Sequence, residues 1–221
     1  MSNKLHIIRT GFFGVNTLIV PLQGNKCFVV DPAGCAASGD QNAVTDYLKT
    51  KKLDCAAIVL THSHFDHITG IAAVKAAFPG AKIAIHEKEI GELAAPPGPM
   101  GEGVIRFFGD MRLMDEVAKQ PPADVALRNG CTLEDAAGKD CGARDWRVIL
   151  TPGHTPGSIC LYNSKEKILI SGDTLFAWGG YGRTDMPGGD EVQIMKSLEL
   201  LKKIIPEGTH VYPGHDQDFV Y

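Results

Sequence analysis

Three short histidine motifs each begin where an apolar, strand-like run ends, and this arrangement constrains the fold more than any other feature of the chain. The run AAIVL leads into THSHFDH, WRVIL leads into TPGHTPGS, and THVY leads into PGHD. A fourth run, KILIS, leads into GDTLF. Gathered at one edge of a sheet, these motifs would form a cage of imidazoles and carboxylates. Its members are His62, His64, Asp66, His67, His154, Asp173 and His215.

This composition indicates a metal site. Imidazole suits zinc, iron and similar metals, and carboxylates supply the charge that holds a divalent cation. His62 and His64 are two residues apart, so on an extended segment they face the same way. Asp66 and His67 follow at once, which indicates a tight turn that presents two pairs of ligands to two neighbouring positions. We therefore predict a site for two metal ions.

The set THSHFDH, GHTPGS, GDTLF and PGHD resembles the metallo-β-lactamase-fold hydrolase superfamily, over about residues 16–216. The string YGRTDMPGG resembles its glyoxalase II-like branch, which includes short bacterial hydroxyacylglutathione hydrolase-type enzymes and persulfide dioxygenases. The resemblance implies an αββα sandwich of two mixed β-sheets flanked by helices. The sequence pattern alone predicts only a mixture of α and β elements.

The resemblance also implies two metal positions, each held by three side chains, and one bridging carboxylate. The first position would be held by His62, His64 and His154. The second would be held by Asp66, His67 and His215. Asp173 would bridge both, together with a water or hydroxide. Zinc is the expected metal, and iron and manganese also suit these ligands.

The expected substrate is a small-molecule thioester such as S-lactoylglutathione, attacked by the bridging hydroxide. Asp66 would also orient this nucleophile, which makes it the candidate catalytic residue. Arg183 is the candidate substrate contact, because the matching position is basic in glyoxalase II relatives and a guanidinium suits carboxylates. A pair with Asp185 or Asp190 that fixes the loop is the competing interpretation.

Two other functions remain open. Persulfide dioxygenases share the patterns THxHxDHITG and GRTD, which this chain has as THSHFDHITG and GRTD. They use a single iron, for which His62, His154 and Asp173 would be ligands. A lactone or other ester hydrolase of the same fold is also compatible. A metal protein without catalysis is disfavoured, because relatives of that kind usually lose ligands. The glutathione specificity is expected to carry over poorly: the sequence continues only six residues beyond His215, and Asp185 stands where full-length glyoxalase II has an aromatic residue.

Composition agrees with a compact enzyme. The 221 residues suit one domain, 1–221, in which about 95–145 form an insertion or lid-like segment.

The net charge of −4 without a basic block argues against nucleic-acid binding. We find no apolar stretch of signal or membrane-span length, and therefore expect no membrane partner. Six dispersed cysteines are expected to be reduced thiols of a cytoplasmic protein. Oligomeric state is not readable from the sequence.

Periodicity predicts the elements between the motifs. Strands are expected at 5–9, 16–21, 27–31, 56–60, 82–86, 146–150, 158–163, 167–171 and 210–212. Helices are expected at 40–51, capped by Asp40, and at 68–78, 86–94, 107–118 and 190–204. Asp31 and Asn16 have two possible roles, hydrogen bonds near the metals or support of a turn, and the structural role is favoured.

Overall fold

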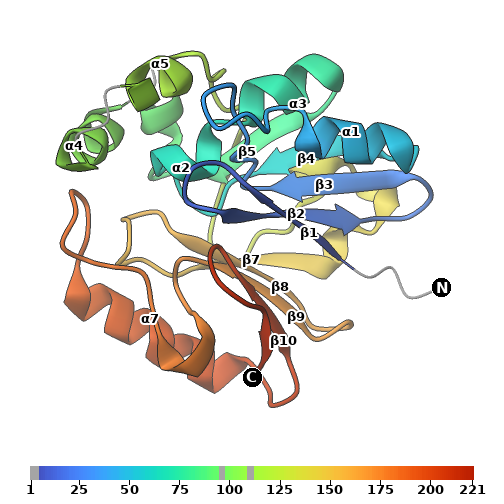
Figure 1. Ribbon diagram of the computed structural model, residues 1–221. Helices are drawn as coiled ribbons and strands as arrows, with labels where there is room; N and C mark the ends of the chain where they lie inside the picture. The colour runs from blue at the N-terminus through green and yellow to red at the C-terminus, as the bar shows by residue number, and fades with distance from the viewer. Residues whose placement is uncertain (1–4, 95–97, 109–111) are drawn as a thin grey trace.

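The computed structural model describes residues 5–94, 98–108 and 112–221, and it stacks two β-sheets between two layers of helices (Figure 1). The first sheet has the strand order β1-β2-β3-β4-β5-β6, and the second has the order β11-β10-β9-β8-β7. Both sheets contain parallel and antiparallel neighbours. The predicted αββα sandwich of two mixed sheets is confirmed.

The strands of the first sheet are β1 (His6–Thr10), β2 (Val15–Pro21), β3 (Lys26–Val30), β4 (Asp54–Val59), β5 (Lys82–His86) and β6 (Val125–Leu127). Those of the second are β7 (Trp146–Leu150), β8 (Ile159–Asn163), β9 (Ile168–Gly172), β10 (His210–Pro213) and β11 (Phe219–Val220). The α-helices are α1 (Ala43–Thr50), α2 (Phe65–Ile68), α3 (Ile71–Ala77), α4 (Pro99–Phe108), α5 (Arg112–Ala118), α6 (Glu134–Ala137) and α7 (Glu191–Ile204). Short 3₁₀ turns are η1 (Ile90–Leu93), η2 (Lys139–Cys141), η3 (Ala143–Asp145) and η4 (Ala177–Gly179).

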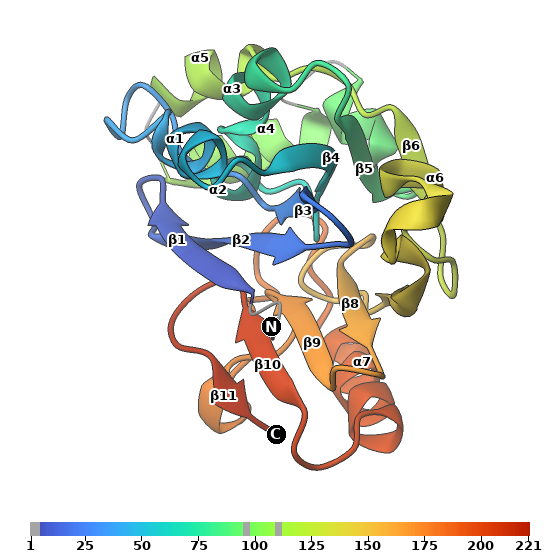
Figure 2. The same ribbon diagram turned by 90° about the vertical axis from the view of Figure 1, so that its right-hand side faces the viewer.

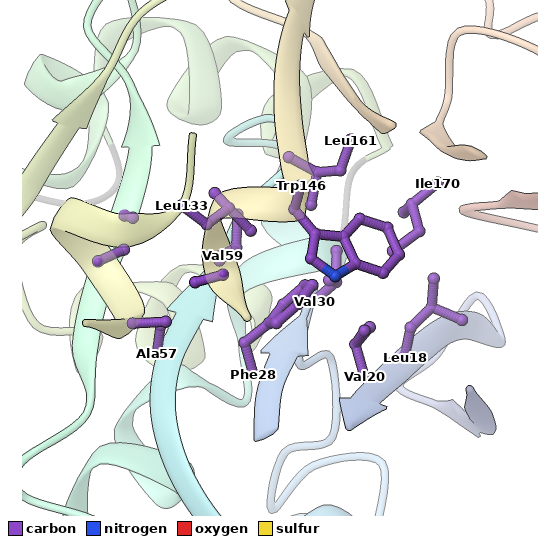
Figure 3. Close-up of a cluster of buried hydrophobic side chains, with 14 of the residues drawn as sticks. Leu18, Val20, Phe28, Val30, Ala57, Val59, Leu133, Trp146, Leu161 and Ile170 are labelled. Carbon is purple, nitrogen blue, oxygen red and sulfur yellow. The ribbon is translucent and has the colours of Figure 1, made fainter. Parts of the chain in front are cut away.

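The two sheets are held together by an apolar core between their inner faces (Figure 3). Phe28 from β3 and Trp146 from β7 meet edge to face, with ring centroids 5.3 Å apart. Leu18, Leu161 and Ile170 surround this pair. Because successive residues of a strand point to opposite faces, the alternate residues of the same strands are left for the outer layers.

Helices cover both outer faces, as Figure 2 also shows. Helices α1 and α3 pack on the first sheet through Leu48, Ile71 and Val74. Helix α7 packs on the second sheet through Leu201. The carboxylate of Asp190 caps α7 by accepting the Gln193 N–H at 3.0 Å. In the described ranges, none of the helices combines the length and apolarity that crossing a membrane requires.

Several details of the predicted elements are wrong. The helix predicted over 86–94 is present only as the short 3₁₀ turn η1. The helix predicted over 107–118 falls on the end of α4 and on α5, and its residues 109–111 lie outside the described residues. Asp40 does not cap α1; the helix begins after Asn42, and the Asp40 carboxylate instead accepts the backbone N–H groups of Gly11 and Cys35. The helix predicted over 68–78 is two helices that break at Gly70, where the backbone approaches so closely that its N–H donates to the Pro32 carbonyl at 2.8 Å. Strands β6 and β11 were not predicted, because each is too short to show a period.

The segment predicted as an insertion or lid, about 95–145, contains several different parts. Helices α4 and α5 pack against α2, with Ile105, Leu113 and Val117 buried in the same cluster as Phe65. Strand β6 then extends the first sheet beside β5. Residues 128–133 run along β7 through backbone hydrogen bonds, as in the bond from the Val148 N–H to the Cys131 carbonyl. A lid role stays a prediction, and residues 95–97 and 109–111 of this segment lie outside the described residues.

Candidate metal centre

The four motifs meet at one edge of the sandwich because each follows the carboxyl end of a strand. THSHFDH follows β4, GHTPGS follows β7, Asp173 follows β9 and His215 follows β10. Backbone bonds tie these loops together across the two sheets: the Ile159 N–H donates to the Thr61 carbonyl at 2.9 Å, and the Asn16 N–H donates to the Gly214 carbonyl at 2.7 Å. The fold therefore brings the four motifs together at one edge of the sheets, as predicted.

The predicted tight turn lies between His64 and α2. His64 is still extended, with φ −60° and ψ 142°, and α2 begins at the next residue. The side chain of Phe65 is 2% exposed and anchors this turn in the core under the site. The extended part thus presents His62 and His64, whereas the first helical turn presents Asp66 and His67.

Three groups of three possible ligands result among the described residues, each with ligand atoms within 4.8 Å of one another. Two of them are the predicted triads, and the third, Asp31 with His62 and His67, shares one histidine with each of the other two. The first triad is His62, His64 and His154. The second triad is Asp66, His67 and His215. In the second, the Nε2 atoms of the two histidines are 3.3 Å apart, and Asp66 Oδ2 lies 3.4 Å from His215 Nε2. The grouping is the one expected for two neighbouring metal positions.

Asp173 lies between the two triads. Its Oδ2 is 3.4 Å from His154 Nε2 in the first triad and 3.6 Å from His215 Nε2 in the second. Its Oδ1 is 3.6 Å from His67 Nε2. A carboxylate with oxygens toward both triads has the geometry of a bridging ligand.

The imidazoles are oriented by hydrogen bonds at Nδ1. His154 Nδ1 bonds to the Arg183 carbonyl at 2.7 Å, and His67 Nδ1 bonds to Asp31 Oδ2 at 3.0 Å. His62 Nδ1 lies 3.0 Å from the Thr61 hydroxyl, which itself donates to Asp31. Partners of this kind fix the ring and its tautomer in metal sites, and leave Nε2 for the ion.

Several polar atoms at the centre are buried without a hydrogen-bond partner among the described residues. They include the Nε2 atoms of His62, His64 and His154, and Asp173 Oδ1. Leaving a buried polar atom unpaired costs about 1–3 kcal/mol, so such a cluster is unfavourable unless a ligand satisfies it. A divalent cation fits this set, because the three nitrogens lie within 4.8 Å of one another and each can offer a lone pair.

Burial and charge set the protonation of the site. Burial, together with the neighbouring His67, holds the pKa of His62 well below its usual range, and burial with His154 does the same for the pKa of His64. Both rings are therefore neutral at pH 7 and able to bind a cation. Burial opposes a charge on His67, but the carboxylates of Asp173 and Asp66 outweigh it and raise the pKa of His67. A metal ion entering there must displace that proton.

Asp31 has the less favoured of its two predicted roles, because it makes hydrogen bonds at the candidate site. Its carboxylate accepts from the Thr61 N–H at 2.8 Å and from the Thr61 hydroxyl at 2.6 Å, besides bonding to His67. Asn16 also acts on the site, since its side-chain amide donates to the carbonyls of Pro213 and Asp216 on either side of His215. Both residues hold candidate ligands in place.

Glu89 is a site residue that the sequence reasoning missed. Its carboxylate is 1% exposed and accepts the Ser63 N–H at 2.6 Å, the Gly157 N–H at 2.8 Å and the Thr155 hydroxyl. Ser63 lies between two candidate ligands, and Thr155 follows a third. Glu89 therefore ties together the two loops that form the first triad. The only signal in the sequence was a glutamate shortly after a strand that ends at the same edge.

Glu89→Ala should destabilise the protein strongly. The substitution leaves two buried N–H groups without their acceptor, and each loss costs on the order of 1–3 kcal/mol. The Thr155 hydroxyl can still bond to Ser158 Oγ. We expect the free energy of unfolding to fall by about 3 kcal/mol in urea denaturation, and by less for Glu89→Gln, which keeps one acceptor oxygen. Equal stability of the alanine variant and the wild type would show that Glu89 does not join the loops.

A cavity of about 270 Å³ opens onto the two triads. Its apolar walls are Phe13, Phe65, Phe176 and Met186. Arg183 also lines it, as a substrate contact must, but its guanidinium makes two bonds of 2.7 Å to the Asp185 carboxylate. The cavity thus offers an apolar approach to the candidate metal ligands.

Known proteins are similar to this chain in sequence and in fold. A hydroxyacylglutathione hydrolase of Bdellovibrio bacteriovorus is 32% identical over 220 residues, covering 98% of this chain and 69% of that protein. The crystal structure of the BLEG-1 B3 metallo-beta-lactamase matches with a TM-score of 0.81 at 32% identity, over 98% of this chain and 94% of that one. The structure of TTHA1623 in a di-iron-bound form matches with a TM-score of 0.75 at 26% identity, over 97% of this chain and 94% of that one.

The family model of the metallo-beta-lactamase superfamily matches residues 9–215, nearly the whole chain. This range contains all seven side chains that the fold gathers around the two triads. The protein is a metallo-hydrolase of the metallo-beta-lactamase superfamily.

Proposed function

We propose that the protein is a dinuclear thioester hydrolase of the glyoxalase II type, with S-lactoylglutathione or a similar small acyl thioester as substrate. The observation that carries this proposal is the pair of triads on either side of Asp173, with buried nitrogens that lack partners among the described residues. Zinc is the metal we expect at both positions, with iron or manganese as alternatives. The di-iron-bound TTHA1623 structure supports two metals in this fold.

The bound metal ions would supply Lewis acidity and a water acidic enough to act as hydroxide at neutral pH. The protein supplies the rest. His62, His64 and His154 would hold one ion, and Asp66, His67 and His215 the other. Asp173 fixes the separation of the two positions. Asp66, whose pKa is kept low by His67 and His215 against the effect of burial, stays ionised and can orient the attacking water.

A thioester suits this cavity because its leaving group is a thiolate, which departs without a strong general acid. The apolar walls formed by Phe65, Phe176 and Met186 exclude water around the acyl group and strengthen the electrostatic interactions there. The hydroxyacylglutathione hydrolase of Bdellovibrio bacteriovorus supports this substrate class. The six cysteines are all free thiols, which supports our proposal of a cytoplasmic enzyme.

A second candidate function is hydrolysis of β-lactams or lactones. The likeness to the BLEG-1 B3 metallo-beta-lactamase at 32% identity favours it. Persulfide dioxygenase activity remains the third alternative, from the shared pattern GRTD at residues 182–185. Thioester hydrolysis and the hydrolysis of β-lactams or lactones differ in the carbonyl compound that is attacked. Persulfide dioxygenation differs from both because it consumes oxygen.

The test is hydrolysis of S-D-lactoylglutathione by purified protein of known metal content, followed as loss of the thioester. We expect turnover that tracks the metal content. In parallel, a chromogenic cephalosporin and oxygen uptake with glutathione persulfide are measured on the same sample. Thioester hydrolysis far below either parallel activity would overturn the proposal in favour of that alternative.

Arg183→Ala should raise KM for an anionic thioester only modestly, by up to about threefold. Asp185 already neutralises the guanidinium, so little attraction is left for a substrate. We also expect a lower melting temperature, because the ion pair fixes the loop whose Arg183 carbonyl orients His154. A tenfold or larger rise in KM at unchanged melting temperature would show instead that Arg183 binds the substrate directly.

A further inference from the structure

A second hollow, of about 550 Å³, lies beside the metal cavity and shares two of its walls, Phe13 and His215. Its remaining walls include Arg9, Trp178, Asp216 and Gln217. The metal cavity of about 270 Å³ is smaller than the roughly 300–1,000 Å³ usual for ligand pockets. A substrate with a long thiol arm must therefore extend beyond it, and the hollow is a neighbouring space that can receive the arm.

Arg9 is the arginine that lines this hollow. Its guanidinium donates to the Asn16 side-chain oxygen at 3.4 Å and to the Asp216 backbone carbonyl at 3.2 Å, both of which are neutral acceptors. Within the described part of the chain, no carboxylate comes within 4.0 Å of it. Arg183, on the wall of the metal cavity, is by contrast already held by Asp185. Arg9 is thus the better anchor for an incoming carboxylate.

Trp178 supplies an aromatic surface to the same hollow. Its side chain is 88% exposed, and its backbone has φ 55°, a left-handed conformation that a bulky residue rarely adopts. The backbone thus holds the indole in water beside the metal cavity, where it contributes nothing to the core. An exposed aromatic surface next to a reaction cavity is one that a ligand can cover.

We propose that this hollow binds the zwitterionic amino-acid end of a glutathione-type thiol, an inference that rests on the proposed thioester hydrolase. Arg9 receives the α-carboxylate, the Asp216 carboxylate receives the α-ammonium group, and Trp178 covers the peptide arm. Arg9 and Asp216 line the same hollow without pairing, so their two charges are complementary to a zwitterion. An anion such as a phosphate would instead be repelled by Asp216.

Binding can be measured without catalysis. The chain has two tryptophans, of which Trp146 is 4% exposed in the core and Trp178 is in the hollow. Metal-loaded protein is titrated with S-methylglutathione, a thioether that cannot be hydrolysed, and tryptophan emission is recorded. We expect a saturable change in emission that is absent in Trp178→Phe. An unchanged emission of the wild type across the titration overturns the proposal.

Three variants assign the contacts. Arg9→Gln and Asp216→Asn should each weaken binding of S-methylglutathione about tenfold, and asparagine tolerates the φ of 64° at residue 216. Arg128→Ala, which removes an exposed arginine paired with Glu87 outside the hollow, should leave the affinity unchanged. Equal affinities of Arg9→Gln and the wild type would contradict the assignment.

Kinetics separate this inference from the proposed function. Arg9→Gln should lower kcat/KM for a glutathione thioester about tenfold through KM, and leave the N-acetylcysteamine thioester of the same acyl group unchanged. An equal loss for both thioesters would mean that Arg9 only supports the fold. If the wild type binds S-methylglutathione through Arg9 but hydrolyses no thioester, the proposed function fails and the binding site stands.

Discussion

Asp173→Ala should abolish hydrolysis and remove metal from both positions. The Asp173 carboxylate lies 3.4–3.6 Å from histidine nitrogens in both triads, so its loss affects both positions. Removing the bridging charge should lower the stabilisation of the transition state by several kcal/mol. This loss corresponds to a fall in kcat/KM of at least about 10³-fold. We expect metal analysis to find less than one equivalent per chain.

The matched control is Asp218→Ala, which deletes a carboxylate that pairs with His210 rather than with a candidate ligand. This variant should keep the metal content and the activity of the wild type. Retention of two full equivalents of metal by Asp173→Ala would contradict the dinuclear assignment, even if the activity were lost.

Gly214→Ala should damage the site without removing any candidate ligand. A Cβ atom at this position would collide with Asp173 Oδ1 and lie 2.9 Å from His67 Cε1. The backbone cannot retreat, because the Gly214 N–H donates to the Gly172 carbonyl at 2.9 Å and the Gly214 carbonyl accepts from the Asn16 N–H. Displacing ligands by about 1 Å can cost about 10²-fold in rate, and we expect a loss of that size together with weaker metal binding.

Gly80→Ala is the control for this second variant. Nothing lies within 4 Å of a Cβ atom at residue 80, between α3 and β5, so the added methyl group meets open space. Its activity and metal content should equal those of the wild type. Wild-type activity of Gly214→Ala would show that the centre is less closely packed than these contacts require.

The residues of the candidate centre could be predicted because their signals are local. An imidazole or carboxylate placed directly after an apolar run is visible in the sequence, and each motif kept this position in the fold. The layered architecture also followed, through the family that the motifs resemble. The grouping of His154 with His62 and His64 came from the same resemblance, since nothing in the spacing relates residues that are about ninety positions apart.

What could not be predicted depends on contacts between distant segments. Glu89 is an ordinary glutamate in the sequence, and its importance comes from the donors of Ser63 and Gly157 that the fold brings to it. For Asp31 the turn role was favoured over the alternative of hydrogen bonds near the metals, because its contact with His67 joins residues 36 positions apart. Arg9 likewise has no motif, and reaches the edge of the site only because β1 pairs with β2 beside the His215 loop.

The central claim is tested most directly by reloading metal-free protein with zinc and measuring S-D-lactoylglutathione hydrolysis at each step of the titration. The account predicts that activity rises until two equivalents are bound per chain and then stays constant, because both triads and the Asp173 bridge are required. Full activity at one equivalent, or activity that does not depend on added metal, would contradict a dinuclear thioester hydrolase.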